Sequence, residues 1–248
     1  NKTFYRMRIR FIFPRIYSFV ASAVNSCAHC ILANSVVREA SELLYPSLSP
    51  EPFSVIHIDL WAPGVTVSPN GNSYVMVCMD ELTGFVYVTP IPDSESRTLA
   101  KHFMEFLLRF GLCSIIVVDA ASTFRGNFKP MSDALNLTIV TLAKRNHPAM
   151  QVERFLRFLN KVSTIASSDR DTPAVVEEAP FVASYAWNSA PIDGTDIVRS
   201  FPAIGRILRF PIDCDPALVP TVEDSSSAVV QFLVLSSHRR TTASSILR

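Results

Sequence analysis

The sequence predicts an α/β fold with a mixed sheet, and three observations lead to this class. A β-rich run at 53–60 is followed by two apolar runs, 74–80 and 84–90, which a short turn joins; this pattern predicts three antiparallel strands. Apolar residues then recur at helical spacing in 94–110. Finally, the run at 114–119 is apolar until it ends in an acid, which indicates a buried strand whose carboxyl end opens onto a site.

The later elements follow from the same kinds of pattern. The helix expected at 94–110 stops before Gly111, a residue type that favours helix ends. A further short strand is expected at 137–142. Residues 154–165 combine apolar positions at helical spacing with basic flanks, so Glu153 is expected at the start of an amphipathic helix. The order βββαβ, then β and α, predicts a mixed five-stranded sheet flanked by helices.

The two ends of the chain have weaker patterns. Residues 1–34 predict a short helical piece that ends at Cys27 and Cys30, with Pro14 near a helix start. A stretch with three prolines and two serines at 45–52 marks a boundary. A helix is expected at 175–187, before a Ser/Thr-rich tail.

Composition narrows the class of protein. In 248 residues 48% are apolar and only 7 are glycine, which favours a packed globular chain, and no apolar run is long enough to cross a bilayer. Five cysteines with one close pair do not make a disulfide framework, so an intracellular, reducing setting is expected. The first residue is Asn1, and the basic leader lacks a secretory pattern; we therefore expect a polyprotein fragment.

Charge gives only a local indication of nucleic-acid binding. The net charge of +1 is lower than nucleic-acid binders usually carry, but residues 1–50 hold six Lys or Arg against two Glu. Lys144, Arg145, Arg154, Arg157 and Lys161 form a second basic group, which we expect to bind phosphate or to be a solvated helix face.

Three acids lie where the predicted elements would bring them together. Asp59 lies in the first strand, Asp119 ends a later strand, and Glu153 begins a helix that could pack across the same sheet. Divalent cations such as Mg²⁺ prefer oxygen ligands, and two-metal phosphoryl transfer needs several carboxylates at one point. Solvated surface acids are the alternative on spacing alone. His57, on the same strand face as Asp59, is expected to be structural.

The residues around these acids resemble those of LTR-retrotransposon integrases. The similar segments are PFSVIHIDLWAP around Asp59, VDAASTF around Asp119, and His147-Pro148 followed by VER around Glu153. The hairpin NGNSYVMVCMDELTG, the pair Phe13-Pro14 before CAHC, and later AWN, FP, GR and FPID segments also match in order across roughly residues 5–213. The specificity comes from the ordered set.

The resemblance implies an RNase H-like fold and an enzyme that acts on DNA. Asp59, Asp119 and Glu153 would hold Mg²⁺ or Mn²⁺ for two reactions, trimming of element DNA ends and joining of the freed 3′-hydroxyl to target DNA. The partners would be DNA and further copies of the chain, acting in the nucleus. It also implies these regions: a zinc-module remnant at 1–44, a linker at 45–52, a catalytic core at 53–166, a post-core helical extension at 167–213 and a tail at 214–248.

Two departures from the family concern the active-site loops. Ala121 stands where the family usually has Gly, which would crowd a backbone that needs positive φ. The run from His147 to Glu153 is two residues shorter than usual and has no glycine. We therefore hypothesise reduced or lost strand transfer with metal binding retained. A core that binds nucleic acid without catalysis, and a nuclease of the same fold, are the alternatives.

The cysteines at the end of the first region match half of a zinc site. Cys27 and Cys30 resemble the Cys half of the family's His-His-Cys-Cys module, and no His precedes His29. Because structural zinc takes four ligands, zinc binding is expected only if a His pair lies upstream of Asn1. Two reduced thiols at a helix end are the other interpretation.

Overall fold

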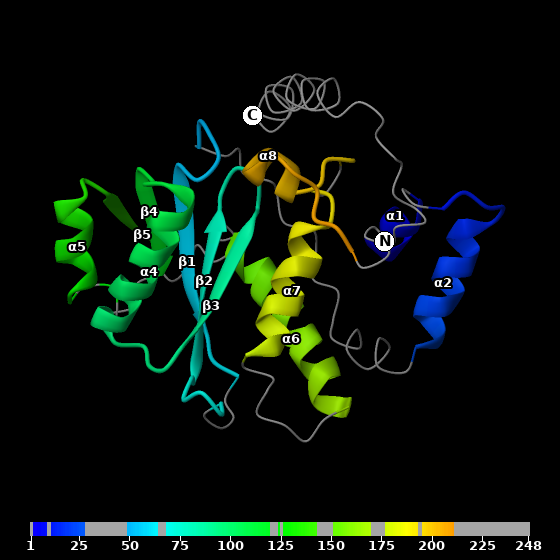
Figure 1. Cartoon of the computed structure of the whole chain (residues 1–248), viewed down its shortest axis with the longest axis horizontal. Coiled ribbons are helices and arrows are strands. Elements are labelled where there is room, and N and C mark those ends of the chain that lie inside the picture. Colours follow the sequence, from blue (N-terminus) through cyan, green and yellow to red (C-terminus); the bar gives the residue numbers. More distant parts are fainter. Residues whose placement is uncertain are drawn as a thin grey trace, which may run out of the picture.

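A five-stranded mixed sheet forms the centre of the molecule (Figure 1). The computed structural model describes residues 2–8, 11–27, 49–63, 68–119, 124, 126–142, 151–169, 177–192 and 195–210. The strands are β1 (Val55–Trp61), β2 (Tyr74–Asp80), β3 (Val86–Ile91), β4 (Ile115–Asp119) and β5 (Thr138–Leu142). Their order is β3-β2-β1-β4-β5; β1, β2 and β3 pair antiparallel, and β4 and β5 run parallel to β1.

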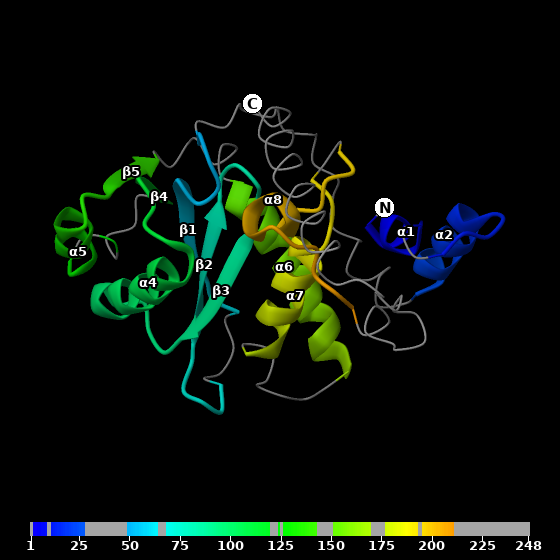
Figure 2. The ribbon, with the colours of Figure 1, turned by 45° about the horizontal axis from the view of Figure 1, so that its top comes forward.

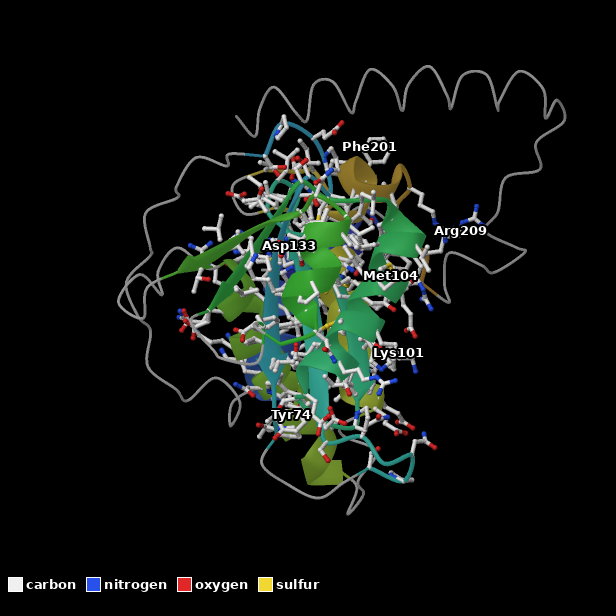
Figure 3. The ribbon with its side chains drawn as sticks, turned by 90° about the vertical axis from the view of Figure 1, so that its left-hand side faces the viewer. Tyr74, Lys101, Met104, Asp133, Phe201 and Arg209 are labelled. Carbon is white, nitrogen blue, oxygen red and sulfur yellow. The ribbon has the colours of Figure 1, made fainter. Side chains whose placement is uncertain are left out.

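Helices cover both faces of this sheet (Figures 1 and 2). The described helices are α1 (Lys2–Arg8), α2 (Ile16–Ser26), α4 (Ser96–Phe110), α5 (Phe128–Ala134), α6 (Gln151–Asp169), α7 (Glu178–Asn188) and α8 (Ser200–Ile204). The α4 and α5 helices lie on one side, with Lys101 and Met104 on α4 and Asp133 on α5 facing the viewer in Figure 3. The α6 and α7 helices lie on the other side. None of the described helices is long and apolar enough to cross a membrane.

Alternation along the strands divides the buried side chains into two cores. In β1, Ile56 and Ile58 pack with Leu99, Phe103 and Phe106 of α4. Trp61 belongs to the opposite core. Because successive side chains of a strand point to opposite faces, the odd-numbered residues of β1 face α6. This alternation decides which helix covers Asp59.

The second core joins β2 and β3 to α6 and α7. Val75, Val77 and Met79 of β2 pack against Val152, Phe155 and Leu159 of α6, with Ala183 and Trp187 of α7 beside them. The α6 residues lie three to four positions apart, so they form one stripe along the helix. Each of these three side chains is fully buried, and α6 is therefore held to the sheet mainly by apolar packing.

The α7 helix is fixed at both of its ends by side-chain hydrogen bonds. Near its start, Glu177 accepts bonds from the side chains of Ser68, Asn70 and Asn72, in the connection between β1 and β2, at 2.6, 2.7 and 3.2 Å. The Ser68 bond is the largest cause of the lowered pKa of Glu177. At its end, Asn188 bonds to both backbone groups of Val86, at 2.8 and 2.7 Å.

These hydrogen bonds define the direction of α7, and through it that of α6. The connection Ser68–Asn72 lies between the end of β1 and the start of β2. Val86 begins β3, which runs in the direction of β1 with β2 between them, so Val86 lies at the same edge of the sheet as the start of β1. The α7 helix therefore runs antiparallel to β1. The end of α6 lies near the start of α7 and the two helices run in opposite directions (Figure 1), so α6 runs in the same sense as β1.

Asp80 orders the entry of the chain into the sheet. Its carboxylate accepts the backbone N–H of Phe53 at 2.8 Å, and the backbone N–H and hydroxyl of Thr83 at 2.9 and 2.5 Å. Phe53 adopts a positive φ of 64°, which is costly for a bulky residue. Burial is the main cause of the raised pKa of Asp80, and its hydrogen bonds oppose that shift.

The first helix of the chain, α1, contacts residues 186–196, which end α7 and follow it. The Tyr5 hydroxyl donates to the Asp196 backbone oxygen at 2.7 Å, and Arg8 lies 3.1 Å from the Asp196 carboxylate. Arg6 donates to the backbone oxygen of Ala186 and to the Ser189 hydroxyl. Residues far apart in sequence thus meet beside α7.

The predicted fold class, an RNase H-like α/β fold with a mixed five-stranded sheet, is confirmed. The α6 helix begins at Gln151, three residues earlier than predicted. The helices α5 and α8 were not predicted. Each has a proline at its third position, where the missing N–H costs no helical hydrogen bond. The predicted regional boundaries stay predictions, and residues 45–48 of the linker at 45–52 lie outside the described residues.

Candidate active site

Strand pairing places Asp59 and Asp119 side by side. The parallel ladder between β1 and β4 pairs Ile58 with Val118, and each acid is the next residue of its strand. Neighbouring strands lie about 4.8 Å apart. Ile58 and Val118 face α4, so both acids point to the opposite face, towards α6. The strand order makes β1 and β4 neighbours in the sheet.

Both strand acids are half-buried at the edge of this ladder. One Asp59 carboxylate oxygen accepts the backbone N–H of Leu60 at 2.8 Å. Two carboxylates at one level of neighbouring strands repel each other, and a cation between them relieves the repulsion. Their oxygens are the ligands that hard divalent cations prefer, so the donor chemistry fits Mg²⁺ or Mn²⁺.

Glu153 comes from the helix that covers the same face. It is the third residue of α6, its side chain is 40% exposed, and Arg157 lies one turn later with a guanidinium nitrogen 3.9 Å from its carboxylate. The buried neighbour Val152 packs in the α6 core. The structure therefore places Glu153 on the face to which Asp59 and Asp119 point.

The three acids share a face, but they do not converge as a closed ligand set. Within the described residues, no three His, Cys, Asp or Glu side chains are arranged to hold a metal ion. Asp59 and Asp119 are neighbours through the sheet, whereas Glu153 depends on how α6 packs. The predicted roles of Asp59, Asp119 and Glu153 as metal ligands stay predictions.

A side-chain hydrogen bond joins this helix to β1. The indole N–H of Trp61 donates to the side-chain oxygen of Asn160 at 2.7 Å. Sequence analysis missed both residues. The available signal was spacing: Trp61 is two residues after Asp59 on the same strand face, and Asn160 is seven residues after Glu153 on the same helix face.

His57 is the remaining polar residue on this face of β1. It is 5% exposed, and neither ring nitrogen has a hydrogen-bond partner. Burial lowers the pKa of His57 to about 4, so the imidazole is neutral in the folded protein at neutral pH. The expectation that it is structural agrees with this burial.

Basic residues follow the exposed side of α6. Arg154, Arg157 and Lys161 are spaced by three and four residues, so they form one stripe beside Glu153. Lys144 and Arg145, predicted to join this group, lie outside the described residues, as do Ala121 and the shortened run at 147–150.

The predicted zinc half-site is only partly described. Cys27 follows the last residue of α2 in an extended conformation and is half-exposed. Cys30 lies outside the described residues. Zinc binding by this pair therefore stays a prediction.

Three relatives match parts of the chain, although no family model does. The chain is 24% identical over 124 residues to the Pro-Pol polyprotein of simian foamy virus type 3 (strain LK3), and 21% identical over 174 residues to the retrovirus-related Pol polyprotein from transposon 412 of Drosophila melanogaster. It is 29% identical over 101 residues to the Gypsy retrotransposon integrase-like protein 1 of Rattus norvegicus. These matches cover 50%, 68% and 41% of this chain.

The chain is a homologue of retroviral and retrotransposon Pol polyproteins and integrases. The matches span only 11%, 14% and 19% of the respective relatives' lengths. Among solved structures, this integrase homologue is similar to a chain of the simian T-cell lymphotropic virus intasome in complex with PP2A regulatory subunit B56 gamma. The TM-score is 0.53 at 18% identity, and 84% of this chain and 70% of that chain are covered. At this identity the likeness supports the fold.

Proposed function

We propose that this chain carries the catalytic core of a retrotransposon-type integrase, an enzyme that trims the ends of element DNA and joins them to target DNA. The observation that carries the proposal is the placement of Asp59 and Asp119 at one level of two parallel neighbouring strands, facing α6. Homology to Pol polyproteins and integrases supports the same class of activity.

The three acids have the chemistry needed for such a reaction. Asp59, Asp119 and Glu153 would hold Mg²⁺ or Mn²⁺, which would stabilise charge on the attacking and leaving oxygens of a phosphodiester. The sheet fixes two of the carboxylates in advance. The third carboxylate would come from α6, which packs on the same face of the sheet.

The basic stripe of α6 would orient the DNA backbone. Arg154, Arg157 and Lys161 lie beside Glu153, and Lys144 and Arg145 precede the helix in sequence. Contacts from Arg and Lys to phosphate position nucleic acid without reading its sequence. We also propose that the core spans 53–166, that copies of the chain assemble on DNA, and that they act in the nucleus.

The test is a divalent-metal assay of end trimming and strand transfer with purified protein. Asp59→Asn, Asp119→Asn and Glu153→Gln should each abolish both reactions while the fold persists. Asp133→Asn is the matched control, because Asp133 lies on α5 and pairs with Lys129 in solvent. Equal activity of all four variants and the parent chain would contradict the proposal.

A second candidate is a core that binds nucleic acid without catalysis. The ion pair between Arg157 and Glu153 favours it, because a guanidinium beside the carboxylate competes with a metal ion. The shortened loop before Glu153 favours it as well. DNA binding that needs Arg154 and Lys161, with no metal-dependent cleavage or joining in the parent chain, would support this candidate over the first.

A further inference from the structure

We propose that the hydrogen bond between Trp61 and Asn160 fixes the position of α6 along β1, so that Glu153 lies at the level of Asp59. Trp61 and Asn160 are then positioning residues for the metal site. This inference rests on the proposed function, because it concerns the residues that support its third carboxylate. Neither residue belongs to the set of acids.

Each partner of the bond shares an element and a face with one of the acids. Trp61 follows Asp59 by two residues, so both side chains point to the same face of β1. Asn160 follows Glu153 by seven residues in α6. Seven residues of a helix with 3.6 residues per turn complete almost two turns, so Asn160 and Glu153 lie on one helical stripe.

The distances along the two elements nearly agree. From Trp61 back to Asp59 the strand covers about 7 Å, at about 3.3 Å per residue. From Asn160 back to Glu153 the helix covers about 10 Å, at 1.5 Å per residue. Because α6 runs in the same sense as β1 (Figure 1), both acids lie on the same side of the bond. Glu153 is thus within about 4 Å of the level of Asp59, and a tilt of the helix reduces that difference.

The apolar contacts between α6 and the sheet define this position less sharply. They include Val152, Phe155 and Leu159, and the hydrophobic effect is non-directional. A shift of α6 by one turn moves Glu153 by about 5.4 Å, beyond the reach of a metal ligand. The Trp61 indole is 6% exposed, so a shift would leave a buried N–H without a partner at a cost of roughly 1–3 kcal/mol.

The bond can be removed without emptying the core. Asn160 is exposed on α6, and its role depends on one side-chain oxygen. Asn160→Leu removes that acceptor, whereas Asn160→Asp keeps it. Thr164→Ala is a matched control, because Thr164 lies one turn further on α6 and bonds only to the Asn160 backbone oxygen in its own helix.

The experiment compares these variants and Glu153→Gln for Mn²⁺ affinity, strand-transfer kinetics and thermal stability. Loss of a group that orients a metal ligand weakens metal affinity about 10–100-fold. We therefore expect Asn160→Leu to weaken Mn²⁺ binding by that factor and to lower kcat with little change in KM for DNA. Asn160→Asp should recover affinity and kcat to within about threefold of the parent chain, and Thr164→Ala should match the parent.

A spectroscopic signal tests the bond itself. The chain has two tryptophans, so two indole N–H resonances are expected in a ¹⁵N spectrum. Asn160→Leu should shift the Trp61 signal and leave the Trp187 signal in place, since the Trp187 indole donates to the Gly84 backbone oxygen at 2.9 Å.

The outcomes distinguish a failure of the positioning role from a failure of the proposed metal site. If Glu153→Gln loses Mn²⁺ affinity while Asn160→Leu binds and reacts like the parent chain, the positioning role is wrong and the proposed function stands. If neither Glu153→Gln nor Asp119→Asn changes Mn²⁺ affinity, the proposed metal site is wrong, and the positioning inference is overturned with it. Failure of Asn160→Asp to recover any affinity also contradicts the role of the acceptor.

Discussion

The two sides of the candidate site are built in different ways. On the sheet side, the backbone ladder between β1 and β4 sets the level of Asp59 and Asp119. On the helix side, the position of Glu153 follows from the apolar packing of α6 and from the hydrogen bond between Trp61 and Asn160. A ladder cannot slip by one residue without turning every side chain to the other face, whereas a packed helix can shift by smaller steps. The strand acids are therefore fixed more firmly than the helix acid.

This difference suggests where activity would be lost first. Changes around α6 can displace Glu153 while the sheet stays intact, and the sequence before α6 is also where the chain departs from its family, in the short run at 147–153. Substitutions on the sheet side and on the helix side should therefore differ in how far they reduce activity and stability.

The largest effect is expected from the strand acids. Asp119→Asn should reduce strand transfer by at least about 1,000-fold, as for groups that act as a unit in catalysis, without changing the melting temperature by more than a few degrees. No adjustment of α6 can compensate, because the sheet holds Asp119 beside Asp59. Strand-transfer rates at saturating Mn²⁺ measure this, with Asp133→Asn as control; activity within tenfold of the parent chain would show that Asp119 is not a ligand.

The next largest effect is a pH dependence of folding stability, which we expect from the buried His57 on the same face of the sheet. Its folded pKa of about 4 lies below the ordinary value of 6.5, so the unfolded chain binds the proton more readily between these values. Folding stability should therefore fall as pH drops from about 6.5 to 4, by about 3 kcal/mol from this residue. Above pH 6.5 this contribution is complete.

Urea unfolding of metal-free protein at several pH values measures this slope. His57→Leu removes the titrating group, so its stability should fall less between pH 6.5 and 4 than that of the parent chain. The opposite contribution of Asp80, whose raised pKa favours the folded state as pH falls, is common to both proteins. If the free energies of unfolding of the parent chain and of His57→Leu fall equally between pH 6.5 and 4, His57 does not titrate in that range.

A smaller effect is expected at the support of the helix side. Asn188→Ala removes both hydrogen bonds to the Val86 backbone and leaves buried groups without partners, which should lower the free energy of unfolding by about 2 kcal/mol. Because α7 packs on α6, we also expect reduced kcat at 37 °C that partly recovers on cooling. Chemical unfolding and kcat at two temperatures test this, with the half-buried Ser184→Ala on the same helix as control.

The smallest effect is expected at the start of α7. Glu177→Gln replaces an exposed carboxylate whose pKa is lowered chiefly by the Ser68 hydroxyl. The contribution of Glu177 to the free energy of unfolding is fully present above the ordinary pKa of a glutamate. It is lost as pH falls through the lowered pKa of the folded protein. The melting temperature at pH 7 should therefore drop slightly, by less than in Asn188→Ala. A larger drop than in Asn188→Ala would reverse the order of the two anchors.

Sequence patterns predicted the sheet side of the site better than the helix side. The apolar run that ends at Asp119 and the β-rich run around Asp59 are local signals, and parallel neighbours bring such ends together. The partner of Trp61 is 99 residues away in sequence, and no local pattern indicates a contact at that separation. The short helices α5 and α8 were missed because Pro130 and Pro202 argued against them, although a first turn tolerates proline.

The binding of Phe53 by Asp80 also has a mechanical consequence. Tension on the chain from its N-terminal side would reach the sheet through the Phe53 amide, which is tied to Asp80 at the far end of β2. Beyond it, β1 pairs with β2 from Ile56 to Trp61 and with β4 from Val55 to Ile58, so the pull acts along the strand and loads several ladder bonds together. We expect the sheet to resist traction from this direction, and an appended domain could pull on residue 49 without peeling β1 away.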